Sequence, residues 1–339
     1  MARPVTNPPN RFGDPIVEWE GPPPRATLEI LDDASRTVLS RNQSPDVPFT
    51  WSVNPYRGCT HACAYCYART FHEYLGYGAG TDFESRILVK RDAPALLEAA
   101  FRRSAWRGEL VAFSGVTDCY QPLERRFALT RTCLQVCANF HNPVSVITRS
   151  PLLVRDLDLL STLDEVAQVT VTFSLPILDR RECAAIEPGA PAPSRRLEAM
   201  AALSEAGIPV GVNVAPMIPG LTDRAIPSIL QAAREAGARW AGLLHLRLPG
   251  AVAAVFEERL RAALPDRADA ILARQRRAHG GNLNDPRLGT RSRGTGPAAD
   301  ATTALFHLWR ERLGYEGHPA PRPGTFRRPP CPGQLSLFP

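Results

Sequence analysis

Short runs of apolar and β-branched residues alternate along the chain with longer segments whose apolar positions recur every three or four residues. The short runs predict six strands, at residues 50–54, 110–113, 144–148, 169–173, 210–214 and 240–246. The longer segments predict helices. In residues 194–206, for example, Ser194 is the expected N-cap, and Gly207 followed by Pro209 ends the helix.

This alternation is typical of a parallel sheet built from βα units. Six such units predict an α/β fold, a partial (β/α)6 TIM-like barrel whose functional residues gather at the C-terminal ends of the strands. An open, doubly wound sheet is the alternative architecture.

Composition divides the chain into four regions. We expect an N-terminal extended arm, the barrel, a C-terminal helical and Gly/Arg-rich extension, and a disordered, flexible proline-rich tail, at residues 1–48, 49–264, 265–317 and 318–339. The arm contains one apolar stretch, at 28–31. The extension is expected to begin with an arginine-rich helix and to end with a helix at 301–313, after a Gly/Arg loop.

The chain carries a net charge of +6, which favours an anionic partner such as nucleic acid. Its basic residues are nearly all arginine, since Lys90 is the only lysine, and with 33 prolines this indicates a compositional bias that weakens the argument. No apolar run is long enough to span a bilayer, and residues 1–24 lack the apolar core of a signal peptide. We therefore expect a cytoplasmic protein without membrane contact, whose eight cysteines are thiols or ligands.

A cysteine motif, Cys59-x3-Cys63-x2-Cys66, follows the first predicted strand. Three thiolates in one tight loop suit three irons of a [4Fe-4S] cluster and leave the fourth iron open to a small molecule. A structural zinc site is the alternative, but it normally needs four protein ligands. The chain has no second Cys-x2-Cys or His-x3-His pair, although His61, within the loop, is a possible fourth ligand.

On this motif, residues 50–250 resemble the radical S-adenosylmethionine (SAM) superfamily, and within it spore photoproduct lyase and its uncharacterised bacterial relatives. Further segments that carry the likeness are 116–118, 146–149, 173–175, 187–189, 195–198 and 214–218. The resemblance implies a [4Fe-4S] cluster on the three cysteines that reductively cleaves SAM to a 5′-deoxyadenosyl radical.

The resemblance also implies how SAM is held. Thr117 and Asp118 are expected to accept hydrogen bonds from its ammonium group, and Arg149 to pair with its carboxylate. Ser174 would add a hydroxyl. The alternative for Thr117 and Ser174 is that each merely ends a strand. Arg149 stands where the lyase has lysine, which keeps the charge but removes a proton-transfer role.

Two residues are expected beside the nucleoside half of SAM, Tyr65 against the adenine and Asn213 near the ribose. At the place of the lyase's hydrogen-donating cysteine this chain has Gly115, so the photoproduct reaction itself is not carried over. Cys119, four residues further on, is the remaining candidate for a catalytic thiol.

The other cysteines allow two interpretations. Cys133 and Cys137 share one face of a predicted helix, and with Cys119 and Cys183 they could hold a second cluster. Free cysteine is also among the most commonly buried residues, and burial is the interpretation that we favour.

The last residues, Gln334, Leu335, Ser336, Leu337 and Phe338, resemble the short peptide with which bacterial polymerases and repair proteins bind the DNA sliding clamp. Leucine and a Leu-Phe pair suit a hydrophobic pocket, and the proline-rich tail would present them. The alternative is a chance pentapeptide. Arginines between 259 and 293 are either phosphate contacts or a solvated helix face and loop.

We therefore expect a radical SAM enzyme that acts on DNA, in repair or lesion processing, on a base flipped from its stack. Its reductant would be a flavodoxin or ferredoxin. One alternative is modification of RNA, a peptide or a metabolite by the same radical. The other is a non-catalytic iron–sulfur adaptor on the sliding clamp.

Overall fold

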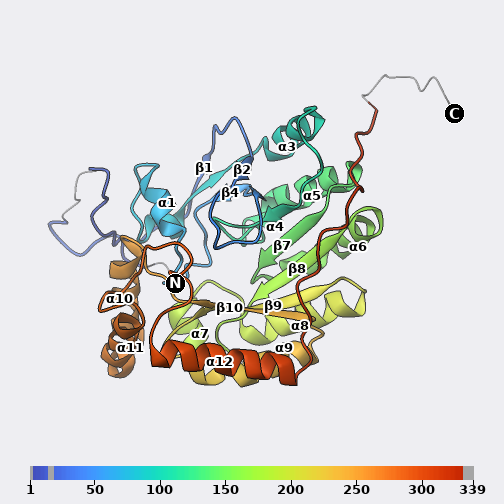
Figure 1. The fold of residues 1–339 in the computed structure, drawn as a ribbon. Helices are drawn as coiled ribbons and strands as arrows, with labels where there is room; N and C mark the ends of the chain where they lie inside the picture. The colour runs from blue at the N-terminus through green and yellow to red at the C-terminus, as the bar shows by residue number, and fades with distance from the viewer. Residues whose placement is uncertain (1–2, 14–18, 331–339) are drawn as a thin grey trace.

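The structure is a computed structural model that describes residues 3–13 and 19–330 (Figure 1). Its main sheet has seven strands in the order β10-β9-β8-β7-β6-β3-β2. All neighbouring pairs are parallel except β2 and β3, which pair antiparallel at one edge. The strands are β2 Leu39–Arg41, β3 Trp51–Val53, β6 Val111–Phe113, β7 Val144–Thr148, β8 Val169–Ser174, β9 Val210–Met217 and β10 Trp240–His245.

The six predicted strands are thus confirmed, and their order decides between the two architectures. In a doubly wound sheet the strand order reverses at a switch point. Here the parallel strands lie side by side in their order along the chain, β3, β6, β7, β8, β9 and β10, while β4 and β5 belong to another sheet. This is the sequential winding of a barrel, and the fold is an α/β partial barrel that β2 extends at its first edge.

Helices connect the strands and pack side by side outside the sheet, α3 on α5, α5 on α6, α8 on α9 and α9 on α12 (Figure 1). Within the described residues, no helix is both long and apolar enough to cross a membrane. The helices are α1 Arg69–Glu73, α2 Asp82–Ser85, α3 Ala93–Arg102, α4 Glu124–Phe127, α5 Leu129–Asn139, α6 Leu157–Val166, α7 Arg180–Ile186, α8 Pro193–Glu205, α9 Ile226–Glu235, α10 Val252–Ala263, α11 Pro265–Ala278 and α12 Pro297–Arg312, with 3-10 turns η1 Pro151–Asp156 and η2 Asp223–Ala225.

Two helix starts differ from the sequence prediction, both because of proline. Helix α8 begins at Pro193 with Ala192 as N-cap, so Ser194 lies in the first turn and does not cap it. Helix α12 begins at Pro297, one turn before the expected 301. Proline is favoured at the first helical position because its φ is already helical and its missing N–H would be unpaired there.

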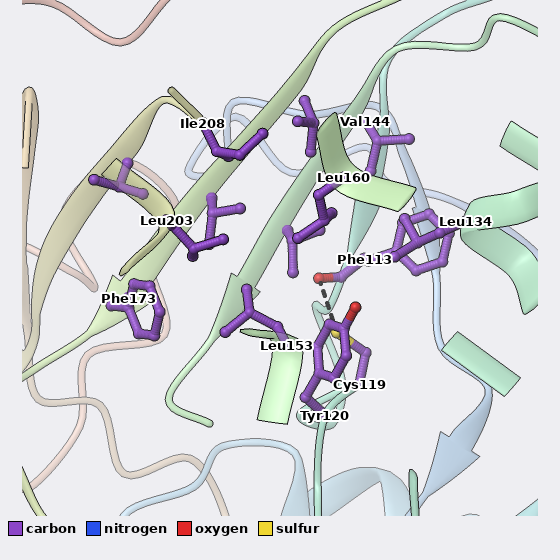
Figure 2. Close-up of a cluster of buried hydrophobic side chains, with 14 of the residues drawn as sticks. Phe113, Cys119, Tyr120, Leu134, Val144, Leu153, Leu160, Phe173, Leu203 and Ile208 are labelled. Carbon is purple, nitrogen blue, oxygen red and sulfur yellow. Dashed lines mark hydrogen bonds between the residues drawn. The ribbon is translucent and has the colours of Figure 1, made fainter. Parts of the chain in front are cut away.

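The largest core lies between the sheet and its helices. Apolar side chains of the strands meet those of the surrounding helices there, and Figure 2 shows part of this cluster, which includes Phe113, Val144, Phe173, Leu134, Leu160 and Leu203. All six are fully or almost fully buried. Burial of each such side chain stabilises the fold by about 1.5–3 kcal/mol, so this core fixes the strands whose ends carry the site.

The N-terminal region, predicted as an extended arm, also forms strands. The apolar stretch becomes β1 (Glu29–Asp32), which pairs in parallel with β5 (Arg86–Val89), and β5 pairs antiparallel with β4 (Tyr56–Arg57). This second, three-stranded sheet has the order β1-β5-β4. Since β4 immediately precedes the cysteine motif, the small sheet braces the loop that carries the thiols.

The proline-rich segment also differs from its prediction as a free tail over residues 318–330. Gln168 donates a hydrogen bond to the Ala320 carbonyl at 3.1 Å, and the Phe326 ring stacks on Phe140 with centroids 6.1 Å apart. The segment runs along the outside of the molecule beside α6 (Figure 1). It is held because its aromatic and arginine side chains find partners on the barrel. Residues 334–338, the predicted clamp-binding peptide, lie outside the described residues.

Candidate functional site

The cysteine loop leaves the C-terminal end of the first barrel strand and is fixed by its backbone. The Cys59 amide donates to the Phe83 carbonyl at 2.8 Å, and the Ala64 amide to the Ile186 carbonyl at 2.9 Å. Gly58 has φ +78°, and a Cβ there would lie 2.9 Å from the Phe83 and Arg86 carbonyl oxygens, so only glycine fits. The loop therefore enters the site in one conformation.

The three thiols of the loop are free, and Cys59 and Cys63 are almost fully buried while Cys66 is partly so. Burial raises the pKa of Cys63 well above its ordinary value, and although Arg149 opposes this, the charges of Glu187, Cys66 and Cys59 raise it further. Burial and the charge of Cys59 likewise raise the pKa of Cys66. The thiols thus repel one another as thiolates unless a positive centre joins them.

Such a donor set fits a cubane cluster, in which each cysteine binds a separate iron. In the part of the chain that the structure describes, no three histidine, cysteine or carboxylate side chains converge on one point as the ligands of a single metal ion would. The candidate ligands for a cluster remain Cys59, Cys63 and Cys66.

His61 lies in the same loop and faces the acid that follows the second strand. Its Nδ1 is 3.4 Å from Asp118 Oδ2, an ion-pair distance without the alignment of a hydrogen bond. Burial alone would lower the pKa of His61, but the Cys59 thiolate and Asp118 raise it to about 9. Burial likewise favours the Cys59 thiol, yet the charge of His61 outweighs it and lowers the pKa of Cys59. His61 thus faces the thiolates as an imidazolium.

Asp118 is held by several hydrogen bonds within the protein. Its Oδ1 accepts hydrogen bonds from the Thr148 hydroxyl at 2.6 Å and the Tyr120 amide at 2.9 Å, and its Oδ2 accepts from the Arg149 amide at 2.9 Å. With His61 beside Oδ2, both oxygens are engaged by the protein. Asp118 therefore ties the segment after β6 and the end of β7 to the cysteine loop, and its contact with the ammonium group of SAM stays a prediction from the sequence.

Arg149, at the end of β7, reaches the cluster loop directly. Its Nη1 lies 3.2 Å from the Cys63 Sγ, 2.8 Å from the Tyr65 hydroxyl and 2.6 Å from Glu187 Oε1. Its guanidinium also lies over the Tyr65 ring, 5.8 Å from the centroid. The structure thus brings together the predicted residues Cys63, Tyr65 and Arg149, which come from two separate strand ends.

Glu187 is the residue that sequence reasoning missed as part of the site. It follows α7 and is almost fully buried. Its carboxylate accepts a hydrogen bond from the Tyr65 hydroxyl and forms ion pairs with Arg149 and Arg196. Burial would raise its pKa, but the Arg196 and Arg149 guanidinium groups lower it to about 2. Glu187 is therefore an anion that orients Arg149 toward Cys63. The only sequence signal for it was its place in a segment that resembled the lyase family.

The remaining predicted SAM contacts occupy separate positions. The Thr117 hydroxyl is buried and donates to the Tyr56 carbonyl at 3.0 Å, four residues after β6 ends, so Thr117 is not the residue that ends the strand. Ser174 ends β8 and is half-buried, and its carbonyl accepts from Arg196 at 3.0 Å. Asn213 on β9 is half-buried, with its side-chain oxygen against Gly242 of β10.

Cys119 is placed away from the loop. Its thiol donates to the Phe113 carbonyl at 3.6 Å and is fully buried in the core beside Tyr120 and Leu153, as Figure 2 shows. The thiol thus faces the core, and its catalytic role stays a prediction from the sequence. Cys133 and Cys137 belong to the same core, whereas Cys183 belongs to a different cluster of buried residues, so these four thiols do not gather around a second cluster.

A parallel partial barrel with three free thiols in a loop after its first strand defines a class of iron–sulfur proteins. Residues 53–233, more than half of the chain, match the family model of the Radical SAM superfamily, and the chain belongs to that superfamily. Proteins of this superfamily use a [4Fe-4S] cluster and SAM.

The relatives with matching sequences are uncharacterised proteins. One from Mycobacterium tuberculosis is 39% identical over 212 residues, which cover 62% of this chain and 62% of that one. One from Methanocaldococcus jannaschii is 29% identical over 196 residues, 58% of this chain and 70% of the other. The chain thus spans under two thirds of the length of the mycobacterial relative.

Among solved structures, the fold is similar to spore photoproduct lyase. The lyase complexed with a dinucleoside spore photoproduct aligns with a TM-score of 0.62 at 17% identity, over 84% of this chain and 80% of that one. A variant of the same lyase with bound AdoMet and the dinucleoside aligns with a TM-score of 0.61, also at 17% identity, over 84% of this chain and 80% of that one. At this identity the likeness concerns the fold.

Proposed function

We propose that the protein is a radical SAM enzyme that binds a [4Fe-4S] cluster on Cys59, Cys63 and Cys66 and acts on DNA. The observation that carries the proposal is the contact of the Arg149 guanidinium with the Cys63 Sγ at 3.2 Å, because it joins a cation of the third parallel strand to a thiol of the loop. When bound and reduced, the cluster supplies the electron that cleaves SAM to a 5′-deoxyadenosyl radical.

The charges around the loop suit this role. His61 and Arg149 both face thiolates, and hydrogen bonds and positive charge near cluster sulfurs set the reduction potential. In the described part of the chain, the hydrogen bonds of the Arg149 side chain all use Nη1. We propose that its Nη2 and Nε pair with the SAM carboxylate, while Tyr65 lies against the adenine.

Two features support DNA as the substrate. The structurally similar lyase was solved with a dinucleoside photoproduct, and this chain exposes aromatic side chains on α1 and at its C-cap, directly after the cysteine loop. Phe71 is 43% and Tyr74 is 61% exposed, and the Arg11 guanidinium lies 5.1 Å from the Tyr74 ring centroid. Exposed aromatic rings beside arginine are the surface on which unstacked bases stack, at about 1–3 kcal/mol per base.

The chemistry can be tested on protein purified without oxygen and loaded with iron and sulfide. Reduction with dithionite in the presence of SAM should yield 5′-deoxyadenosine from the wild type and not from Cys63→Ala. Failure of fully loaded wild type to yield it, with and without DNA, would support the non-catalytic adaptor instead.

The DNA assignment needs a separate test. Single-stranded DNA should bind the wild type and should bind Tyr74→Ala several-fold more weakly, whereas Leu308→Ala, which removes a 60%-exposed side chain on α12, should bind as the wild type does. RNA bound more tightly than DNA of the same sequence would move the substrate to the RNA alternative. No binding of either would leave the peptide and metabolite alternatives.

A flavodoxin or ferredoxin as reductant, the sliding clamp as partner and a cytoplasmic location stay predictions from the sequence. Removal of residues 334–338 tests whether these residues bind the sliding clamp. The truncated chain should fail to bind the immobilised clamp while it still cleaves SAM.

A further inference from the structure

The only lysine of the chain lies in a cavity behind the cysteine loop. The cavity measures about 130 Å³ and lies between β4, the start of α1 and the ends of β3 and β6. Its walls include Gly58 and Ala68, which flank the cysteine motif, and Val116, which packs against the buried cluster that contains Cys59. The described residues that line it are Ser40, Asn54, Tyr56, Arg57, Gly58, Ala68, Phe71, His72, Lys90 and Val116.

Lys90 is 8% exposed, and its Nζ keeps contact with solvent although most of the residue is buried. In the residues that the structure describes, its backbone forms hydrogen bonds with Pro55 and Ala93, but its Nζ has neither a hydrogen-bond acceptor nor a carboxylate within ion-pair distance. A charge that is largely removed from water is stabilised by a counter-ion. Lys90 is therefore available to bind an anion that enters the cavity.

The nearest acid cannot serve as that counter-ion. Asp33 accepts from Arg57 Nε at 2.6 Å and from the Ser35 amide at 2.8 Å, so its charge is already balanced. Burial lowers the pKa of Lys90, and the Arg57 charge lowers it further against the opposing effect of Asp33. None of the described lining residues is Asp or Glu. The cavity thus carries surplus positive charge.

The composition gives an independent reason to single out this position. Every other basic residue of the chain is arginine, yet the residue at this buried position is lysine. Phe71, which also lines the cavity, is 43% exposed and so belongs both to the cavity and to the aromatic surface of α1.

We propose that this cavity is a phosphate subsite for a DNA strand, in which Lys90 and Arg57 bind one phosphate group and Phe71 packs against the adjoining base. The inference rests on the proposed function, since it takes the anion to be part of DNA. In this arrangement the bound DNA strand runs from the cavity over α1 and passes behind the cysteine loop.

The single lysine makes a direct test available. Acetic anhydride acylates amines, and peptide mass spectrometry then reports the labelling of Lys90 against the chain's α-amino group as internal reference. On loaded protein kept under argon, single-stranded DNA and, separately, inorganic phosphate should each slow the acylation of Lys90 about tenfold, as expected when the site is about 90% occupied. SAM alone should not.

A pair of variants tests the same point by affinity. The logarithm of the association constant falls with the logarithm of salt concentration by about 0.7 for each phosphate contact on a single strand. Lys90→Gln should therefore reduce this slope by about 0.7 in fluorescence anisotropy with a labelled oligonucleotide. Arg91→Gln removes the same charge one residue away, from a 54%-exposed side chain paired with Asp32, and should keep the wild-type slope.

The outcomes separate the subsite from the proposed function. DNA that binds without protecting Lys90, or an unchanged slope in Lys90→Gln, would overturn the subsite and leave the DNA substrate standing. Protection by inorganic phosphate without any DNA binding would overturn both, and would make the cavity a site for a small phosphate ester. Protection by SAM alone would assign Lys90 to the cofactor.

Discussion

The Nη1 atom of Arg149 lies 3.2 Å from the Sγ atom of Cys63, although the two residues are 86 positions apart in the chain. The contact links the end of β7 to the cysteine loop after β4, and the buried Glu187 holds the guanidinium in place from a third connection. The loop and the strand ends therefore form one charged unit, and the first two predictions concern its parts.

Arg149→Gln removes the positive charge and the donor at Cys63. We expect the reduction potential of the loaded cluster to become more negative and the rate of SAM cleavage to fall at least about tenfold, because charge and hydrogen bonds at cluster sulfurs raise the potential. Electron paramagnetic resonance during redox titration measures the first, and 5′-deoxyadenosine formation the second. Arg195→Gln, at a 65%-exposed position on α8, is the matched control. A potential equal to that of the wild type would contradict the assigned contact.

Glu187→Gln leaves the buried Arg149 and Arg196 without their shared anion. We expect a loss of about 3–5 kcal/mol in the free energy of unfolding, the usual cost when one partner of a buried ion pair is removed. Glu198→Gln breaks an exposed pair with Arg195 and should cost less than about 1 kcal/mol. Denaturant titration of both variants measures the difference. Similar losses in the two would mean that the Glu187 carboxylate is solvated in the folded protein.

Cys119→Ala should keep the iron–sulfur absorption and the rate of 5′-deoxyadenosine formation, since the thiol lies in the core and bonds only the Phe113 carbonyl among the described residues. The expected cost is about 1 kcal/mol of stability, typical of a small core truncation. Cys59→Ala should instead lose the absorption. If Cys119→Ala forms the radical but no longer turns over DNA, the thiol has a catalytic role after all.

His245, at the end of β10, should make stability dependent on pH. Burial, and then the charge of His279, lowers the pKa of His245 to about 4, against about 6.5 in an unfolded chain. Below pH 6.5 His245 therefore becomes protonated in the unfolded chain, whereas in the folded protein it stays neutral until about pH 4. Stability contributed by neutral His245 is complete above pH 6.5, and about 2 kcal/mol of it is lost by pH 5.

The measurement compares denaturant midpoints at pH 7 and pH 5. His245→Gln should lose about 2 kcal/mol less than the wild type over this interval, because glutamine cannot take up the proton. His307→Gln, at an exposed position on α12, should follow the wild type. An identical pH dependence in all three proteins would mean that His245 is solvated.

Secondary structure was predictable wherever neighbouring residues in the sequence determine it. The runs that became β6 to β10 are apolar and β-branched because parallel strands are buried on both faces. The start of α8 was misplaced because Pro193, and not a capping serine, sets it. Residues 318–330 were expected to be free, because the local sequence of a proline-rich segment does not predict that Phe326 packs on Phe140, which is distant in the chain.

The sequence by itself determined the strands of the main sheet and the three thiols of the loop, because strand periodicity and a spacing of three and two residues are local properties of the chain. The order of the strands came from the tertiary structure. The tertiary structure decided which charges meet. Asp118 accepts hydrogen bonds from the Thr148 hydroxyl and the Arg149 amide, which come from another strand end. Glu187 is buried against two arginines from separate segments, and Lys90 lines a cavity without a carboxylate beside it. Electrostatic partners are set by proximity in space, which no local pattern encodes.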